Sequence, residues 1–312
     1  MPDYLYLILG LAMLLLGGEW LVKAAVDIAL RSKISLLVVG MTVVSFATSA
    51  PELLVSVEAA VSGYLDLSFG NVLGSNMANL ALVLGVTALL MPIAVSEKTI
   101  RRDYWIMALV TGLLFVLLLD GALVFWEGAL LVALLVLYIL YQIRSSSHSD
   151  IPDELQDAQL YHPALMAFYL LGGMAGLHFG SDFLVTGAVG LARTWGISER
   201  IIGITMVSIG TSLPELAASI SAIIKRRQDI SLGNLVGSNI FNILAVLGIT
   251  SLIQDLTAQS PDLLRFDFPW LLGITLLLYP LIAYFGRGVI SRGQGALMLG
   301  VYLLYMSSLF LL

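Results

Sequence analysis

The sequence predicts an all-α membrane protein with about ten transmembrane helices in two inverted five-helix repeats. First, 59% of the 312 residues are hydrophobic and only 12% are charged, whereas soluble domains carry about 25% charged residues. Second, apolar runs recur along the whole chain, each near the length of about 20 residues that crosses a bilayer as a helix. Third, a long stretch of the first half of the chain recurs in the second half.

Several other structural classes are excluded by composition. The apolar runs are continuous, whereas barrel strands alternate in segments of about ten residues. The chain has no cysteine, so it has no disulfide, thiolate metal site or cysteine nucleophile. No basic patch suggests nucleic acid as a partner. The first apolar run, residues 5–16, lacks a basic region before it, so we expect a retained helix rather than a signal peptide.

One polar joint, RSSSHSDIPDELQD from Arg144 to Asp157, divides the chain. We expect five helices before it and five after it. The predicted organisation is a first five-helix repeat in residues 1–143, a linker in residues 144–162 and a second five-helix repeat in residues 163–312. The linker is too short for a folded domain, which usually needs about 50 residues.

The basic residues of the short loops predict the orientation. One side carries Arg31, Lys33, Lys98, Arg101, Arg102, Arg144, Lys225, Arg226, Arg227, Arg287 and Arg292, and the other side carries only Arg193, Arg200 and Arg265. Because cytoplasmic loops are enriched in Lys and Arg, we expect the first side and the linker to be cytoplasmic. Both termini would then be extracellular in a multi-pass protein of the cell membrane.

The internal duplication sets the expected symmetry. GGEWLVKAAVDIA from Gly17 aligns with GSDFLVTGAVGLA from Gly180, and this shift of 163 residues holds to about residue 90. Two motifs recur within it: SFATSAPELL as SIGTSLPELA, and GNVLGSNMANLALVLG as GNLVGSNIFNILAVLG. A five-helix unit crosses the membrane an odd number of times, so its second copy must be inverted. Inverted repeats place the substrate site near the midplane, at interrupted helices in matching positions.

A proline interrupts the expected helix in each copy of the first motif. Pro51 and Pro214 have no N–H and crowd the carbonyl one turn earlier, so we expect freed main-chain oxygens near residues 47–48 and 210–211. In lipid such carbonyls cost several kcal/mol unless protein, water or an ion satisfies them. A cation-binding cavity would satisfy them.

Glu52 and Glu215 directly follow the prolines and are the central candidate ligands. Ionisable side chains at membrane depth are functional by default. The other candidate ligands supply neutral oxygens: Ser45, Thr48, Ser49, Ser75 and Asn79, with their counterparts Ser208, Thr211, Ser212, Ser238 and Asn242. Ca²⁺ prefers such all-oxygen sites, with about six to eight ligands, and two carboxylates would balance one divalent ion.

Structural explanations remain open for part of this set. Small residues line transmembrane interfaces in any case, and Asn76 and Asn239 are expected only to tie helices together. The three histidines, His148, His162 and His178, are expected to be isolated, with no second ligand at helical spacing.

The paired P-E and G-S-N-x-x-N motifs resemble those of the cation/calcium exchanger superfamily, and the chain is most similar to the short prokaryotic sodium/calcium exchangers. The resemblance implies that the Glu52 and Glu215 carboxylates hold Ca²⁺ with the main-chain oxygens of Thr48 and Thr211. It implies flanking Na⁺ sites at Ser45, Thr48, Ser49 and Ser75, and at Ser208, Thr211, Ser212 and Ser238, with Asn79 and Asn242 in the middle. Asn242 stands where some relatives carry aspartate, so K⁺ co-transport is not expected.

We therefore expect a secondary active antiporter that exchanges Ca²⁺ for Na⁺. The resemblance implies that the first and sixth helices slide to alternate access. Two alternatives stay open: a Ca²⁺/H⁺ exchanger, because burial favours a neutral carboxyl, and a passive cation channel. We expect no enzymatic activity, no cofactor apart from the transported ions, no partner apart from those ions and the bilayer, and function as a monomer.

Overall fold

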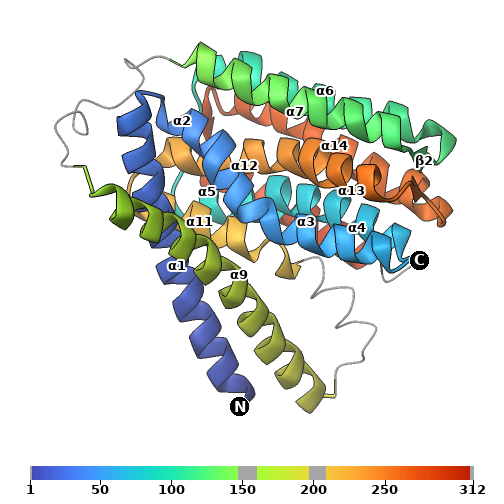
Figure 1. Cartoon of the computed structure of the whole chain (residues 1–312), viewed down its shortest axis with the longest axis horizontal. Helices are drawn as coiled ribbons and strands as arrows, with labels where there is room; N and C mark the ends of the chain where they lie inside the picture. Colours follow the sequence, from blue (N-terminus) through green and yellow to red (C-terminus); the bar gives the residue numbers. More distant parts are fainter. Residues whose placement is uncertain (1, 147–159, 197–208, 310–312) are drawn as a thin grey trace. The chain divides into compact units, whose positions relative to one another are not determined.

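The computed structural model describes residues 2–146, 160–196 and 209–309, which are almost entirely helical (Figure 1). The prediction of an all-α membrane protein is confirmed. Within these residues, eight segments are long and apolar enough to span a membrane: Asp3–Ser32, Leu36–Val61, Leu65–Leu90, Thr99–Asp120, Phe125–Ser145, Pro163–Thr194, Gln228–Ile253 and Leu263–Phe285. Two shorter helices are α11 (Leu213–Ile224) and α15 (Arg292–Ser308). The assignment of ten crossings stays a prediction.

Most of these spans are composite helices. Three are plain α-helices: α1 (Asp3–Ser32), α7 (Phe125–Ser145) and α9 (Pro163–Thr194). The others join α-helix to π-helical or 3-10 turns: α2 (Leu36–Val39), η1 (Gly40–Val44) and α3 (Ser45–Val61); α4 (Leu65–Met77), η2 (Ala78–Val83) and α5 (Leu84–Leu90); η3 (Thr99–Asp103), α6 (Tyr104–Leu117) and η4 (Leu118–Asp120); α12 (Gln228–Phe241), η6 (Asn242–Leu247) and α13 (Gly248–Ile253); η7 (Leu263–Asp267), α14 (Phe268–Pro280) and η8 (Leu281–Phe285).

The helices form two compact units that do not follow the two halves of the sequence. Unit 1 contains residues 1–48 and 142–234, and unit 2 contains residues 49–141 and 235–312. Each unit therefore combines segments of both predicted repeats. The repeat boundaries drawn from the sequence stay a prediction, and the units are described separately below.

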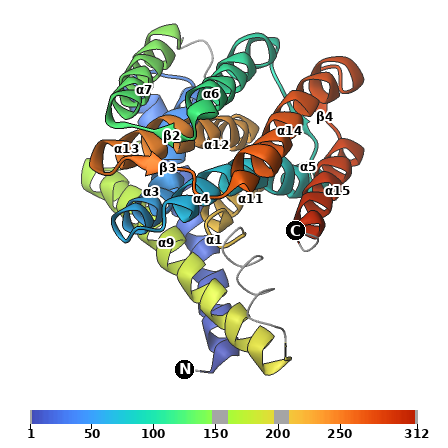
Figure 2. The same ribbon diagram turned by 90° about the vertical axis from the view of Figure 1, so that its right-hand side faces the viewer.

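Unit 1 is built around α1 and α9, which lie side by side (Figure 2). Close backbone approach at glycines makes this packing possible. A Cβ atom at Gly10 would lie 2.5 Å from the Leu184 nitrogen, and one at Gly17 would lie 2.7 Å from the Leu177 nitrogen. As residue numbers rise along α1, those of the contacted α9 residues fall, so the two helices are antiparallel.

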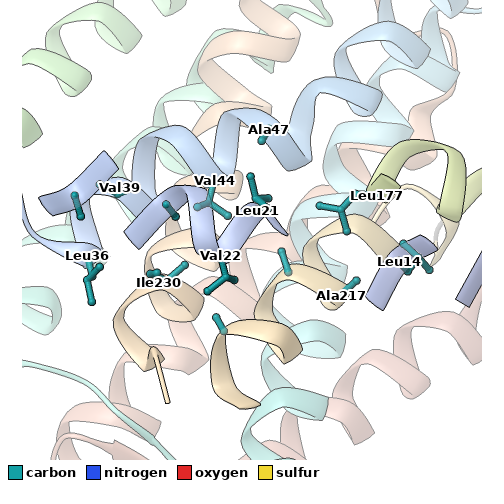
Figure 3. Packing of buried hydrophobic residues seen from close by; sticks show 14 residues of the cluster. Leu14, Leu21, Val22, Leu36, Val39, Val44, Ala47, Leu177, Ala217 and Ile230 are labelled. Atoms are coloured by element: carbon teal, nitrogen blue, oxygen red, sulfur yellow. The ribbon is translucent and has the colours of Figure 1, made fainter. Parts of the chain in front are cut away.

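The same glycine contacts appear a second time with the helices exchanged. Gly173, the repeat counterpart of Gly10, would meet the Leu21 nitrogen at 2.8 Å, and Gly180, the counterpart of Gly17, would meet the Leu14 nitrogen at 2.8 Å. The shift of 163 residues converts each contact into its partner. The packing of α1 on α9 therefore has the two-fold symmetry that an inverted repeat requires. Figure 3 shows the apolar cluster beside it, with Leu14 and Leu177 among its buried members.

Unit 2 carries two short antiparallel sheets that reveal the same inversion. Strand β1 (Ile93–Ala94) pairs with β4 (Val289–Ile290), and β2 (Ala122–Leu123) pairs with β3 (Leu256–Thr257). A helical segment of 22 residues, Thr99–Asp120, separates β1 from β2. At about 1.5 Å per residue, it places the two sheets at opposite ends of the unit.

The repeat-related helices of unit 2 end at different sheets. The α4–α5 span leads into β1, whereas α13 leads into β3, which corresponds to β1 under the repeat shift. These equivalent helices therefore run in opposite directions. Each unit thus contains an antiparallel pair of repeat-related helices, which supports the inversion predicted from the odd number of crossings.

Candidate cation site

The first copy of the P-E motif lies within a continuous helix. Helix α3 runs from Ser45 to Val61 with Pro51 inside it, so the prediction of a broken helix here is wrong. The irregularity lies upstream, in the π-helical turn Gly40–Val44. Membrane helices tolerate proline when neighbouring groups and local π adjustments accommodate the freed backbone. Pro51 still has no N–H to donate to the Ala47 carbonyl.

The second copy of the motif shows the expected interruption. Thr211 and Ser212 form a turn, and α11 begins at Leu213 with Pro214 in its first turn. The Gly210 carbonyl, however, accepts a 2.6 Å hydrogen bond from the Ser181 hydroxyl of α9. A protein hydroxyl therefore satisfies this freed carbonyl, which is one of the ways, beside water or an ion, in which such a group is accommodated in a membrane.

Both candidate carboxylates are completely buried. Glu52 lies in α3 and Glu215 lies in the first turn of α11, and each has 0% exposure. The N-terminal turn of a helix carries partial positive charge, which favours the Glu215 carboxylate. Burying an ion costs several kcal/mol unless other charges and hydrogen bonds compensate. Two such groups at matching positions are therefore typical of a site that binds cations.

In unit 1 two predicted hydroxyl ligands share one partner, Asn234. The Ser45 hydroxyl donates to the Gly40 carbonyl at 2.8 Å and to the Asn234 carbonyl at 3.1 Å. The Thr48 hydroxyl donates to Asn234 Oδ1 at 3.1 Å. Asn234 Nδ2 in turn donates to Ser219 Oγ at 3.4 Å. Asn234 therefore connects α3 to α11.

In unit 2 the counterpart of Asn234 contacts the segment that follows Glu52. Asn71 Nδ2 donates to the Glu52 carbonyl at 3.1 Å and to Ser56 Oγ at 2.9 Å. Ser56 corresponds to Ser219 under the repeat shift. The asparagine–serine contact is thus made twice, once in each unit.

A second asparagine cluster joins the repeat-related helices of unit 2. Asn242 Nδ2 donates to Asn76 Oδ1 at 3.1 Å, and Asn76 Nδ2 donates to the Asn239 carbonyl at 3.2 Å. The Asn76 side chain thus ties the helices together, whereas Asn239 takes part only through its main-chain carbonyl and its own amide donates to the Leu235 carbonyl within α12 at 2.8 Å.

Asn79 and Asn242 lie in the π-helical turns η2 and η6, at matching positions of the two halves. Such turns are frequent at functional sites. Across the described part of the chain, both polar side-chain atoms of Asn79 and Oδ1 of Asn242 are buried without a hydrogen-bond partner. Buried polar atoms usually have partners, so these atoms are suited to contact a ligand.

The predicted ligands divide between the two units. Unit 1 contains Ser45, Thr48, Thr211, Ser212 and Glu215, and unit 2 contains Ser49, Glu52, Ser75, Asn79, Ser238 and Asn242. All of these are buried except Thr211, which is partly exposed. Ser208 lies outside the described residues. Each unit therefore holds one of the two carboxylates.

Sequence reasoning overlooked the two asparagines that organise these ligands. Asn71 and Asn234, like Ser56 and Ser219, are identical pairs within the aligned motifs. The duplication that singled out the glutamates is the signal that would have found them.

The expectation for His178 is also corrected. His178 Nε2 lies 3.8 Å from Asp182 Oδ2, one helical turn further along α9, so this histidine is not isolated. The described residues contain no group of three or more His, Cys, Asp or Glu side chains that could hold a metal ion.

Comparison with known proteins identifies the family. The sodium/calcium exchanger protein family matches residues 3–144 and 165–311. The chain belongs to this family. CaxA of Alkalimonas amylolytica is 39% identical over 313 residues, covering 98% of both chains. The sodium/calcium exchanger MaX1 of Methanosarcina acetivorans is 30% identical over 348 residues, covering 99% of this chain and 98% of that one.

A solved structure of the sodium-calcium exchanger NCX_Mj also matches, with a TM-score of 0.83, 32% identity and 98% coverage of both chains. The resemblance drawn from the P-E and G-S-N-x-x-N motifs is thereby confirmed. The protein is a multi-pass membrane exchanger of the sodium/calcium family, which transports cations including Ca²⁺.

Proposed function

We propose that this exchanger moves Ca²⁺ out of the cell in exchange for Na⁺, by alternating access to oxygen ligands near the membrane midplane. The observation that carries the proposal is the complete burial of Glu52 and Glu215 at matching positions of the duplicated motif. Na⁺ and Ca²⁺ are similar in size and differ in charge. Buried carboxylates can therefore exchange one divalent ion for several monovalent ions, and competition for the same oxygens couples the two fluxes.

In this proposal each ion is assigned ligands of a different chemical type. Ca²⁺ is held by the Glu52 and Glu215 carboxylates with the main-chain oxygens of Thr48 and Thr211. Na⁺ uses the serine and threonine hydroxyls, and Asn79 and Asn242 complete the set. The exchanger needs no cofactor, carries out no covalent chemistry and works as a monomer.

The proposed orientation places the basic loops and the linker in the cytoplasm and both termini outside. It rests on the excess of Lys and Arg in one set of short loops.

Ca²⁺/H⁺ exchange is the second candidate, because burial of both carboxylates also suits a proton as the competing ion. Radiolabelled Ca²⁺ uptake into proteoliposomes separates the candidates. Vesicles loaded with Na⁺ at equal internal and external pH are expected to accumulate Ca²⁺, and vesicles with a pH gradient but no Na⁺ are not. Uptake that follows the pH gradient and ignores Na⁺ would reject the sodium proposal. Uptake that needs no counter-ion would indicate a channel.

A further inference from the structure

Asn234 accepts hydrogen bonds from two hydroxyl groups in the proposed ligand set. Its main-chain oxygen accepts from Ser45 at 3.1 Å, and its Oδ1 accepts from Thr48 at 3.1 Å. All three residues are completely buried. They belong to the same unit, although Thr48 and Asn234 are 186 residues apart in the chain.

The direction of these hydrogen bonds determines what the hydroxyls can offer to an ion. A hydroxyl has one hydrogen to donate and two acceptor lone pairs. A cation binds only lone pairs, so a hydroxyl is a prepared ligand when its hydrogen is already held by a protein acceptor. Asn234 Oδ1 at 3.1 Å is the nearer of two acceptors for the Thr48 hydrogen, the other being the Ser45 carbonyl at 3.4 Å. Gly40 and Asn234 share the Ser45 hydrogen.

The repeat counterpart Asn71 contacts the helical segment that carries Glu52. Its amide donates to Ser56 Oγ at 2.9 Å, as that of Asn234 does to Ser219 Oγ at 3.4 Å. Asn71 Nδ2 also donates to the Glu52 carbonyl at 3.1 Å. This bond holds α3 at the residue that carries the carboxylate, immediately after the position where Pro51 removes a helical hydrogen bond.

We propose that Asn71 and Asn234 are a repeat-related pair of positioning residues with divided roles. Asn234 orients the Ser45 and Thr48 hydroxyls for Na⁺, and Asn71 fixes the Glu52 segment for Ca²⁺. Neither asparagine needs to contact an ion. The inference rests on the proposed sodium/calcium exchange. Within it, the affinity for Na⁺ depends on Asn234 and the affinity for Ca²⁺ depends on Asn71.

Asn234→Ala tests the first role. In proteoliposomes the Na⁺ concentration that gives half-maximal Ca²⁺ uptake is expected to rise by roughly fivefold, the effect of losing about one hydrogen bond. The maximal rate at saturating Na⁺ is expected to change less. Asn239→Ala is the matched control, because Asn239 is a buried asparagine of the same helix whose amide donates to Leu235 within α12 at 2.8 Å. The control should keep the wild-type Na⁺ dependence.

A double-mutant cycle distinguishes positioning from general support of the fold. Thr48→Val removes the hydroxyl and keeps the main-chain oxygen. If Asn234 acts through Thr48, Asn234→Ala should add little to the effect of Thr48→Val on Na⁺ half-saturation. Full additivity, or an unchanged Na⁺ half-saturation in Asn234→Ala, would overturn the role. Asn234→Ser serves as the second variant if the alanine protein does not fold, and the same rise is expected.

Asn71→Ala tests the second role. It is expected to raise the half-saturating Ca²⁺ concentration by roughly fivefold and to change Na⁺ half-saturation less. A larger change in Na⁺ half-saturation than in Ca²⁺ half-saturation would contradict the division of roles. Failure of the underlying function is recognised separately, because wild-type vesicles would then show no Na⁺-driven Ca²⁺ uptake at all.

Discussion

Glu52→Gln and Glu215→Gln are each expected to reduce Ca²⁺ uptake at subsaturating Ca²⁺ by about 10- to 100-fold. The substitution keeps the size of the side chain and removes one of only two carboxylates in the proposed ligand set. A hydrogen bond or contact to a charged group contributes about 1.5–3 kcal/mol, and each 1.4 kcal/mol is a factor of ten in affinity. Because the two glutamates occupy matching positions, losses of similar size are expected.

Glu58→Gln is the matched control for this experiment. Glu58 lies on the same helix as Glu52 but is exposed, and serine occupies its repeat position. Its uptake should stay near that of the wild type. Normal flux in either buried variant would remove that glutamate from the ligand set.

Pro51→Ala is expected to stabilise the protein and to impair transport at the same time. Alanine at position 51 restores an N–H that can bond the Ala47 carbonyl inside the continuous helix α3. Proline in a helix interior costs up to about 3 kcal/mol relative to alanine, so a rise in the thermal midpoint should accompany the change. Transport should fall, since a main-chain oxygen beside the proposed ligands becomes engaged in the helix.

Pro214→Ala provides the internal comparison. Pro214 lies in the first turn of α11, where an N–H has no helical partner and proline is favoured. Little or no gain in the thermal midpoint is therefore expected. If both substitutions raised the thermal midpoint equally, the position of each proline, inside α3 or in the first turn of α11, would not determine its effect on stability.

The sequence was sufficient for the fold class, the duplication and the buried glutamates. Composition and apolar runs predicted the membrane helices, and the odd number of crossings predicted the inversion seen in the glycine contacts of α1 with α9. These features depend on properties that are summed over many residues. An irregular turn or an unusual contact in one helix therefore does not change the predicted fold class or the predicted inversion.

Details that depend on one contact were not predictable. The continuity of α3 through Pro51 is a tertiary effect that overrides the local preference of proline. The acceptance of the Ser181 hydrogen by Gly210 depends on the packing of α9. The partners of Asn234 lie far away in the chain, and no propensity of asparagine indicates which hydroxyls it will meet.

Equilibrium binding of radiolabelled Ca²⁺ to the purified protein, measured against increasing Na⁺ at constant pH and ionic strength, tests the central claim most directly. If the two ions compete for the same oxygens, Na⁺ should displace Ca²⁺ completely. The apparent Ca²⁺ affinity should then fall more steeply than in proportion to Na⁺, because several Na⁺ ions replace one Ca²⁺. Ca²⁺ binding that is indifferent to Na⁺ and is abolished only by acid would contradict a shared sodium/calcium site.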